Sequence, residues 1–369
     1  MRTSFIMAFS ASTCLAIACN GDDSAATTTA TTTATTGATS TGSASSSSST
    51  STTAASESSG SAGESEGSTG ETTGETTGGP GEDRLDLPEL ELIDDGHFAT
   101  SLVCGECHSN EASATAMRDE KDREIAPDNL WQGSMMANSA RDPFWWAMVA
   151  AETATFPAAK DAIEGECMHC HTPMAVVDGA FHDEDTPTLD WLFEGDDRAS
   201  FGLDGVACTA CHQIQPDNLG TPESFSGHYI IEPVAEIYGP HADPFTGPMM
   251  MHTSFTPTQG TQLLDSAHCG TCHSLITDAL TPEGTPSGHS LNEQSPYLEW
   301  RASAYTTEGV PGPDAASCQD CHVPKTSVDG VPITTRIARR PPGGDFGQID
   351  PRDPFGRHVM VGGNAIMPL

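Results

Sequence analysis

The feature of this sequence that most constrains its fold is a five-fold repeat of the pattern Cys-x-x-Cys-His. The copies are CGECH from Cys104, CMHCH from Cys167, CTACH from Cys208, CGTCH from Cys269 and CQDCH from Cys318. They use ten of the 12 cysteines in the 369-residue chain, and successive histidines of the repeat stand 41 to 63 residues apart. A group bound at each copy would fix five points of the fold.

The pattern predicts covalent attachment of a c-type haem at every copy. In this linkage two thiols bind the two vinyl groups of one porphyrin, so the ring fixes their spacing, and the next histidine lies beneath the iron. We therefore expect five haem c groups as iron cofactors. The attachment cysteines are Cys104, Cys107, Cys167, Cys170, Cys208, Cys211, Cys269, Cys272, Cys318 and Cys321, and the proximal iron ligands are His108, His171, His212, His273 and His322.

Structural zinc and redox dithiols are the alternatives that also use paired cysteines. A zinc site needs two nearby cysteine pairs, or a pair of cysteines and a pair of histidines, around one ion. Here the pairs are far apart in the sequence and each has its own histidine. A redox dithiol needs no such histidine and rarely recurs. The repetition therefore favours haem.

Nine further histidines exceed the five ligands needed on the distal sides of five irons. His268 directly precedes the fourth copy, and His358 is the only histidine after the fifth. Met135 and Met136 are alternative ligands that would raise the potential of one iron. His169 occupies a variable position of the second copy, where it either forms a hydrogen bond or ligates a neighbouring haem. The candidate distal iron ligands are His228, His241, His252, His268 and His358.

The N-terminus predicts export and lipid attachment. "MRTSFIMAFSASTCLAIACNGDD" has one positive charge, an apolar run and small residues before Cys19, and it is too short for a spanning helix. Residues 1–18 are the expected export signal, and "LAIAC" resembles a bacterial lipobox with Cys19 as the lipid anchor. We expect a periplasmic, outer-membrane or cell-surface lipoprotein of a bacterium, held to the membrane by this anchor alone.

Residues 19–81 are expected to form a disordered tether, because Thr, Ser, Ala and Gly offer too little apolar surface to offset the entropy of ordering. Residues 82–369 then form the predicted pentahaem cytochrome domain. Its apolar end, "GRHVMVGGNAIMPL", is typical of an element that packs onto a following segment. This end indicates a chain cut short or one part of a longer gene product.

The net charge of −37 disfavours nucleic acid and anionic lipid surfaces as partners. A basic or cationic redox protein is compatible with it. The expected partners are redox proteins or quinol-linked electron donors, with a small-molecule electron acceptor as a further candidate.

The expected fold is mainly α with extensive irregular loops, because Pro and Gly recur throughout and alternating strand patterns are absent. Two helices are expected in "APDNLWQGSMMANSARDPFWWAMVAAETATF", capped by Asp128 and Asp142, and another begins after Ser295. Since only 36% of the residues are hydrophobic, the expected core consists of stacked covalent haems. The tryptophans expected to face haems or the core are Trp131, Trp145 and Trp146.

Seven stretches between residues 130 and 364 resemble the multihaem c-type cytochromes grouped around cytochrome c554. They are "LWQGSMMANSARDP", "GECMHCHTPM", "DGVACTACHQ", "SAHCGTCHSL", "YLEWRASAY", "SCQDCHVP" and "HVMVGGN". The resemblance implies closely spaced, mostly bis-histidine haems in a largely helical and irregular head that passes electrons. It also implies that His358 is a distal ligand.

Three functions are compatible with these features of the sequence. The first is electron transfer through an array of five covalently bound haems outside the cytoplasm. The second is a multihaem oxidoreductase acting on a small nitrogen or sulfur compound, which needs an open iron position and acid or base groups. The third is a binding or adhesion module braced by haem. Pentahaem nitrite reductases use a Cys-x-x-Cys-Lys motif that this sequence lacks, so no catalytic residue is predicted and an electron carrier is favoured over an enzyme.

Overall fold

The computed structural model describes residues 87–194 and 198–362. The chain divides into two units, Met1–Gly74 and Glu75–Leu369, and all described residues belong to the second. The predictions for the export signal, the lipid anchor at Cys19 and the tether therefore lie outside the described residues. The domain boundary at residue 82 stays a prediction.

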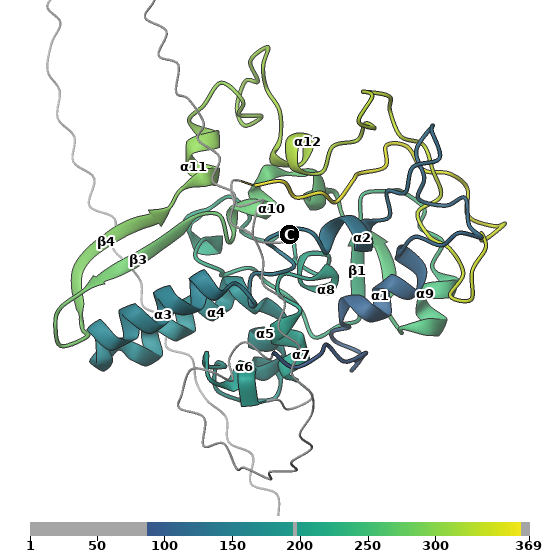
Figure 1. The fold of residues 1–369 in the computed structure, drawn as a ribbon. Helices are drawn as coiled ribbons and strands as arrows, with labels where there is room; N and C mark the ends of the chain where they lie inside the picture. Colours follow the sequence, from purple (N-terminus) through teal and green to yellow (C-terminus); the bar gives the residue numbers. More distant parts are fainter. Residues whose placement is uncertain (1–86, 195–197, 363–369) are drawn as a thin grey trace, which may run out of the picture. The chain divides into compact units, whose positions relative to one another are not determined.

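Most of the regular structure consists of short helices, and long irregular segments connect them (Figure 1). The α-helices are α1 (Ser101–His108), α2 (Pro127–Trp131), α3 (Pro143–Thr155), α4 (Lys160–His171), α5 (Pro173–Phe181), α6 (Trp191–Glu194), α7 (Ala199–Leu203), α8 (Cys208–Cys211), α9 (Gly247–His252), α10 (Ser266–Gly270), α11 (Pro296–Arg301) and α12 (Cys318–His322). The 3-10 helices are η2 (Pro157–Ala159), η3 (Pro222–Ser224) and η4 (Thr261–Leu264).

Two small sheets accompany these helices. Strand β1 (Glu236–Gly239) pairs in parallel with β2 (Thr256–Gln259), with Glu236 opposite Thr256. Strands β3 (Leu275–Leu280) and β4 (Pro286–Gln294) form an antiparallel hairpin with two register shifts. In Figure 1 this hairpin lies beside α3 and α4, and a Cβ at Gly284 in its turn would be 2.9 Å from the backbone of Ala158.

The predicted fold class is wrong on two points. First, helix accounts for 34% and strand for 12% of the described residues, so the fold mixes helices with small sheets. Second, the core is formed by side chains and not by stacked haems. Five clusters of buried apolar residues make it up, and the two largest are centred on α2, α5, α7 and α8 and on α3, α4, α6 and α7.

The three tryptophans belong to this side-chain core. Trp131 packs with Phe98 and Phe201 in the first cluster, and Trp145 and Trp146 pack with α4 and α7 in the second. All three are at most 8% exposed. The prediction that they face the core is therefore confirmed, and their large apolar area explains how a sequence poor in hydrophobic residues still buries a core.

Two of the three predicted helix starts are correct. Asp142 caps α3, where its Oδ1 accepts a hydrogen bond from the backbone N–H of Phe144 at 2.9 Å, and Ser295 occupies the N-cap position of α11 without a side-chain bond. The prediction that Asp128 caps α2 is wrong. This helix begins at Pro127 with Ala126 as its N-cap, two residues earlier than predicted, because proline is pre-organised for the first helical position.

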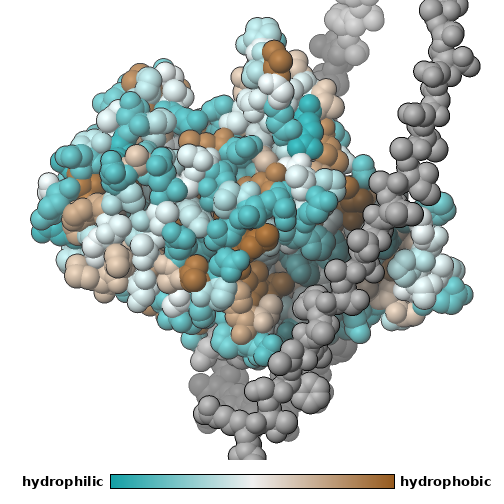
Figure 2. Space-filling model, turned by 180° about the vertical axis from the view of Figure 1, so that it is seen from behind, coloured by the Kyte–Doolittle hydropathy of each residue, from teal (hydrophilic) through white to brown (hydrophobic). Residues whose placement is uncertain are grey.

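The face shown in Figure 2 carries separate hydrophobic patches within a largely polar surface. No helix in the described ranges combines the length and the apolar character needed to cross a membrane.

Gly205, between α7 and α8, cannot be replaced without strain. Its φ is +64°, and a Cβ there would lie 2.7 Å from the Met136 carbonyl oxygen and 2.9 Å from that of Ala137. We expect Gly205→Ala to lower the free energy of unfolding by about 2 kcal/mol, because left-handed strain and close backbone contact act together. Urea denaturation measures this loss. Gly347→Ala, whose Cβ would meet no atom within 4 Å, is the control, and equal losses in both variants would contradict the prediction.

Candidate functional site

The five Cys-x-x-Cys-His copies all begin on short helices. Copies one, two and five lie wholly within α1, α4 and α12, while α8 ends at the second cysteine of copy three and α10 ends within copy four. The helical turn continues in both of the latter, since the backbone N–H of His212 bonds the Cys208 carbonyl at 2.9 Å and that of His273 bonds the Cys269 carbonyl at 3.0 Å. A helical turn places residues i, i+3 and i+4 on one face, so both thiols and the histidine of each copy lie together.

Four of the five attachment histidines use the same ring nitrogen for a hydrogen bond to the backbone. A carbonyl oxygen can only accept, so Nδ1 must carry the proton and Nε2 keeps its lone pair. Metal-ligating histidines usually have this arrangement. The bonds run from His108 to Ile337 at 2.9 Å, from His171 to Ser139 at 2.9 Å, from His212 to Tyr238 at 2.7 Å and from His322 to Val361 at 2.7 Å.

Burial keeps most of these imidazoles neutral. It lowers the pKa values of His108, His171, His212 and His273 below the ordinary value for histidine. A histidine must be neutral to bind a metal ion, so the proton state and the free Nε2 both suit iron ligation.

Cysteines of different copies lie close enough together to shift one another's pKa. Cys104 raises the pKa of Cys208, Cys272 raises that of Cys170, and Cys318 raises that of Cys269, with burial as a second cause each time. Helix α1 also packs on α8, and α10 packs on α12. Copies one and three, two and four, and four and five are therefore neighbours.

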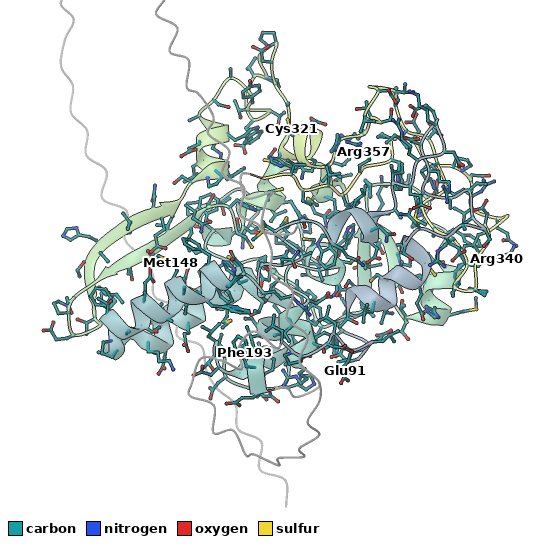
Figure 3. The ribbon with its side chains drawn as sticks, viewed as in Figure 1. Glu91, Met148, Phe193, Cys321, Arg340 and Arg357 are labelled. Atoms are coloured by element: carbon teal, nitrogen blue, oxygen red, sulfur yellow. The ribbon has the colours of Figure 1, made fainter. Side chains whose placement is uncertain are left out.

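The attachment cysteines are partly accessible. Nine of them are half-buried, and Cys321, labelled beside α12 in Figure 3, is exposed. None of the ten forms a disulfide within the described part of the chain. Thiols at this depth are shielded by the fold and still reachable by a group that binds at these copies.

Two of the five candidate distal ligands lie next to His212 of copy three. The ring centroids of His358 and His212 are 6.2 Å apart, with the ring planes 22° from parallel. The Nδ1 of His358 bonds the Gly356 carbonyl at 3.1 Å. His268 is 9% exposed, and its Nδ1 has no hydrogen-bond partner in the described chain. Burial first, and then the neighbouring His212, lowers the pKa of both rings to about 4.

The other three candidates have different surroundings. His252, at the end of α9, pairs through Nε2 with the carboxylate of Glu106 inside copy one. His228 lies with its ring centroid 6.4 Å from that of His169, inside copy two. His241 is half-buried, and burial followed by the nearby Arg352 lowers its pKa. For none of these three does the structure describe a contact with a proximal histidine.

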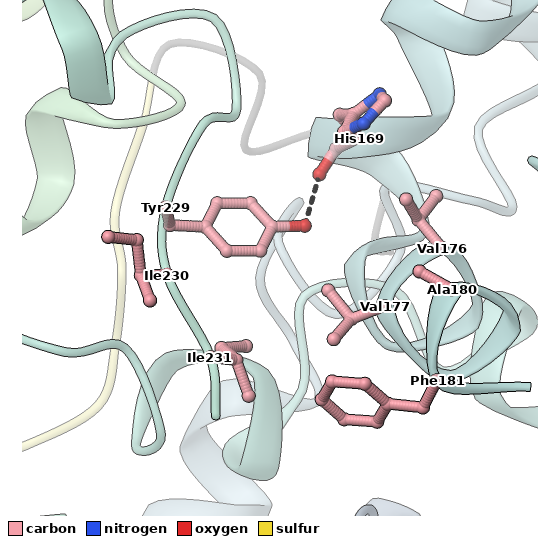
Figure 4. A pocket seen from close by; sticks show the side chains of 8 residues that line it. All are labelled: His169, Val176, Val177, Ala180, Phe181, Tyr229, Ile230 and Ile231. Carbon is pink, nitrogen blue, oxygen red and sulfur yellow. Dashed lines mark hydrogen bonds between the residues drawn. The ribbon is translucent and has the colours of Figure 1, made fainter. Parts of the chain in front are cut away.

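An apolar cavity of about 340 Å³ lies between α5 and the segment after His228 (Figure 4). Tyr229 crosses it, and its hydroxyl donates a hydrogen bond to the backbone carbonyl of His169 at 2.8 Å. His169 lies within α4, and its Nδ1 bonds the Gly165 carbonyl at 2.7 Å, which agrees with the interpretation that this side chain forms a hydrogen bond. The lining residues are His169, Val176, Val177, Ala180, Phe181, Tyr229, Ile230 and Ile231.

Sequence reasoning did not assign Tyr229 or Trp145 to the site. The side chain of Tyr229 as a whole is half-buried. Burial of its hydroxyl, and then the nearby cysteines of copies two, three and four, raise the pKa of this hydroxyl above the usual value. Trp145 stacks on His171 with ring centroids 4.3 Å apart. The only indication in the sequence was the tryptophan pair in "DPFWW", expected to face haems or the core.

Comparison with known proteins leaves the family open. No protein-family model matches the chain, and no curated protein and no solved structure is significantly similar to it. Within the described residues, no group of three or more His, Cys, Asp and Glu side chains is arranged to hold a metal ion. The resemblance to multihaem cytochromes stays a prediction.

Proposed function

We propose that this protein transfers electrons through five covalently bound c-type haems outside the cytoplasm. The observation that supports this best is that a cysteine of every copy lies close to a cysteine of another copy. Electron transfer between haems requires short separations, and a set of unrelated structural metal sites would not need such proximity. The proposal assigns haem attachment to the ten cysteines of the repeat and iron ligation to their five histidines.

The side chains present fit a haem at each copy. The described cysteines form no disulfide, the Nδ1 atoms of four attachment histidines are held by backbone carbonyls, and the wall of the neighbouring cavity is apolar like a porphyrin face. A bound haem supplies reversible one-electron exchange at its iron. The chain itself orients the imidazoles through backbone carbonyls, keeps them neutral by burial and holds the attachment points together.

The cell-surface or periplasmic location and the lipid anchor at Cys19 are part of the same proposal, since haem c is attached outside the cytoplasm in bacteria. Redox proteins of opposite charge and quinol-linked donors are the proposed partners. The charge of −37 supports a positively charged partner surface, because opposite charges accelerate encounter. Mass spectrometry of the mature N-terminus would test the anchor, and an unmodified Cys19 would remove it from the proposal.

Covalent haem content is the first measurement. The full chain, expressed in a host that attaches haem c, should contain five haems per polypeptide by mass spectrometry and by the pyridine haemochrome absorbance. Replacing both cysteines of one copy with Ala should remove one haem. A chain that retains zinc and no haem would overturn the proposal.

The spin states of the irons separate the carrier from the enzyme. Electron paramagnetic resonance of the oxidised five-haem protein should show only low-spin ferric signals, because a carrier needs every iron filled. A stoichiometric high-spin signal in the unmodified protein would mean an open iron. It would favour an oxidoreductase acting on a small nitrogen or sulfur compound.

A further inference from the structure

The second Cys-x-x-Cys-His copy has an aromatic cover on its attachment histidine. The indole of Trp145 lies flat on the imidazole of His171, with ring centroids 4.3 Å apart and planes within 4° of parallel. Trp145 is 8% exposed and belongs to the second core cluster. Its place is fixed because Asp142 and Pro143 start α3 and α3 packs on α4, which contains the copy.

Trp145 also lies near the first cysteine of the same copy. Burial raises the pKa of the Cys167 thiol, and Trp145 acts in the opposite direction. The indole N–H is buried without a hydrogen-bond partner among the described residues, and such an unpaired donor costs free energy. Once Cys167 forms a thioether, its sulfur can still act as a weak acceptor for this N–H.

The edge of the imidazole that carries Nδ1 is held by Ser139. The Nδ1 of His171 donates to the Ser139 carbonyl at 2.9 Å, and the Ser139 hydroxyl donates in return to the His171 carbonyl at 2.9 Å. The ring of His171 is thus held by a hydrogen bond in its plane and by the indole on one face. Its rotation about the bond to a metal would be restricted.

We propose that Trp145 is a positioning residue for the haem of the second copy, and that it sets the redox potential and the ferric spectrum of this haem. The inference rests on the proposed function. Groups around a ligating histidine tune the metal through ring orientation and ligand charge. An electron-rich indole face favours the more positive imidazole on a ferric iron. Removing the indole is therefore expected to raise the potential of one haem.

The experiment compares three substitutions at Trp145 in the five-haem protein. Trp145→Leu and Trp145→Met remove the aromatic face, and Trp145→Phe keeps a ring but loses the N–H. Potentiometric titration followed by electron paramagnetic resonance should show one midpoint potential raised and one low-spin signal altered, with four unchanged. The shift should be smaller for the Phe variant than for the Leu and Met variants.

Trp146 provides the matched control. It is the next residue of α3 and is equally buried at 8%, but its indole bonds the Ala140 carbonyl at 2.9 Å and packs edge-on against Phe193. Trp146→Leu should lower the melting temperature without changing any potential or low-spin signal. A general effect of removing a core tryptophan would appear in both variants.

The outcomes separate this inference from the proposed function. Unchanged spectra and potentials in folded five-haem Trp145→Leu and Trp145→Met variants would overturn the positioning role and leave the carrier intact. Equal shifts in Trp146→Leu would also overturn it, because the effect would then be structural. If the unmodified protein binds no haem, the proposed function itself fails. If Leu does not fold, the Met and Phe variants decide.

Discussion

Under the proposed function the chain binds five haems, and His358→Ala is then expected to open one of the five irons. In the oxidised five-haem protein, one low-spin ferric signal should be replaced by one stoichiometric high-spin signal, and the reduced variant should bind one carbon monoxide per chain. Two imidazoles that ligate one metal from opposite sides have ring centroids roughly 6 Å apart, since each metal–nitrogen bond is about 2 Å. The centroids of His358 and His212 are separated by 6.2 Å.

His268 is the rival ligand for the same iron. It is buried beside His212, and its Nδ1 has no partner in the described chain, whereas the Nδ1 of His358 is bonded to the Gly356 carbonyl. A bonded Nδ1 leaves Nε2 of His358 with a lone pair for iron, which favours His358. His268→Ala should therefore keep all five irons low-spin.

His289 is the control for loss of any histidine, because it lies exposed on β4. His289→Ala should leave the spectrum unchanged. A high-spin signal in His268→Ala together with an unaltered His358→Ala would exchange the two assignments. If neither variant changes, the iron of copy three takes its distal ligand from elsewhere.

The parts of the fold that could be predicted depend on neighbouring residues. Asp142 followed by Pro143, and Ser295 followed by Pro296, mark helix starts because capping and the fixed φ of proline act within one turn. Strands β1 and β2 have four residues each, and every residue of β4 is exposed. No buried and exposed residues alternate along β4, so the pattern that reveals a strand was absent from the sequence.

The candidate site, like the fold, has parts that the sequence predicts and parts that depend on distant contacts. The grouping of two thiols and one histidine in each copy could be read from the sequence because a copy spans only five residues, and the haem that this spacing indicates stays a prediction. The neighbours of the remaining histidines could not be predicted, because they depend on contacts between segments that are distant in the sequence. His252 pairs with Glu106, and His358 lies beside His212. The core was mispredicted because composition does not reveal how completely single large residues, such as Trp131, are buried.

A buried carboxyl beside the first copy should give this protein a distinct pH dependence of stability. The carboxylate of Asp204 accepts hydrogen bonds from the backbone N–H and the hydroxyl of Ser101, at 2.7 and 2.6 Å, at the start of α1. It is 1% exposed. Burial raises its pKa to about 6, against the opposing effects of Ser101 and Arg141.

The sign of the effect follows from proton binding. The ordinary pKa of this carboxyl is 3.8, so between about pH 4 and pH 6 the folded state binds more protons than the unfolded state. Stability contributed by protonated Asp204 is therefore present at low pH and is lost as the pH rises through about 6. The loss between pH 4 and pH 7 should be about 2 kcal/mol, given the size of the shift.

Asp204→Asn is expected to remove this dependence. The amide is neutral at every pH, and it can accept from the Ser101 N–H while donating to the Ser101 hydroxyl. The difference in unfolding free energy between variant and unmodified protein should thus move by about 2 kcal/mol in favour of the variant from pH 4 to pH 7. Urea denaturation of the full five-haem chain, followed by tryptophan fluorescence, measures it.

Asp314→Asn supplies the matched control, because Asp314 is exposed. Its unfolding free energy should follow that of the unmodified protein at every pH. Comparison with this variant corrects for the removal of one acidic charge from a chain of net charge −37. Parallel curves for Asp204→Asn and the unmodified protein would show that the pKa of Asp204 is the same in the folded and unfolded states. The cost of burying its charge would then be fully offset by Ser101 and Arg141, and Ser101 at the start of α1 would donate to a charged carboxylate.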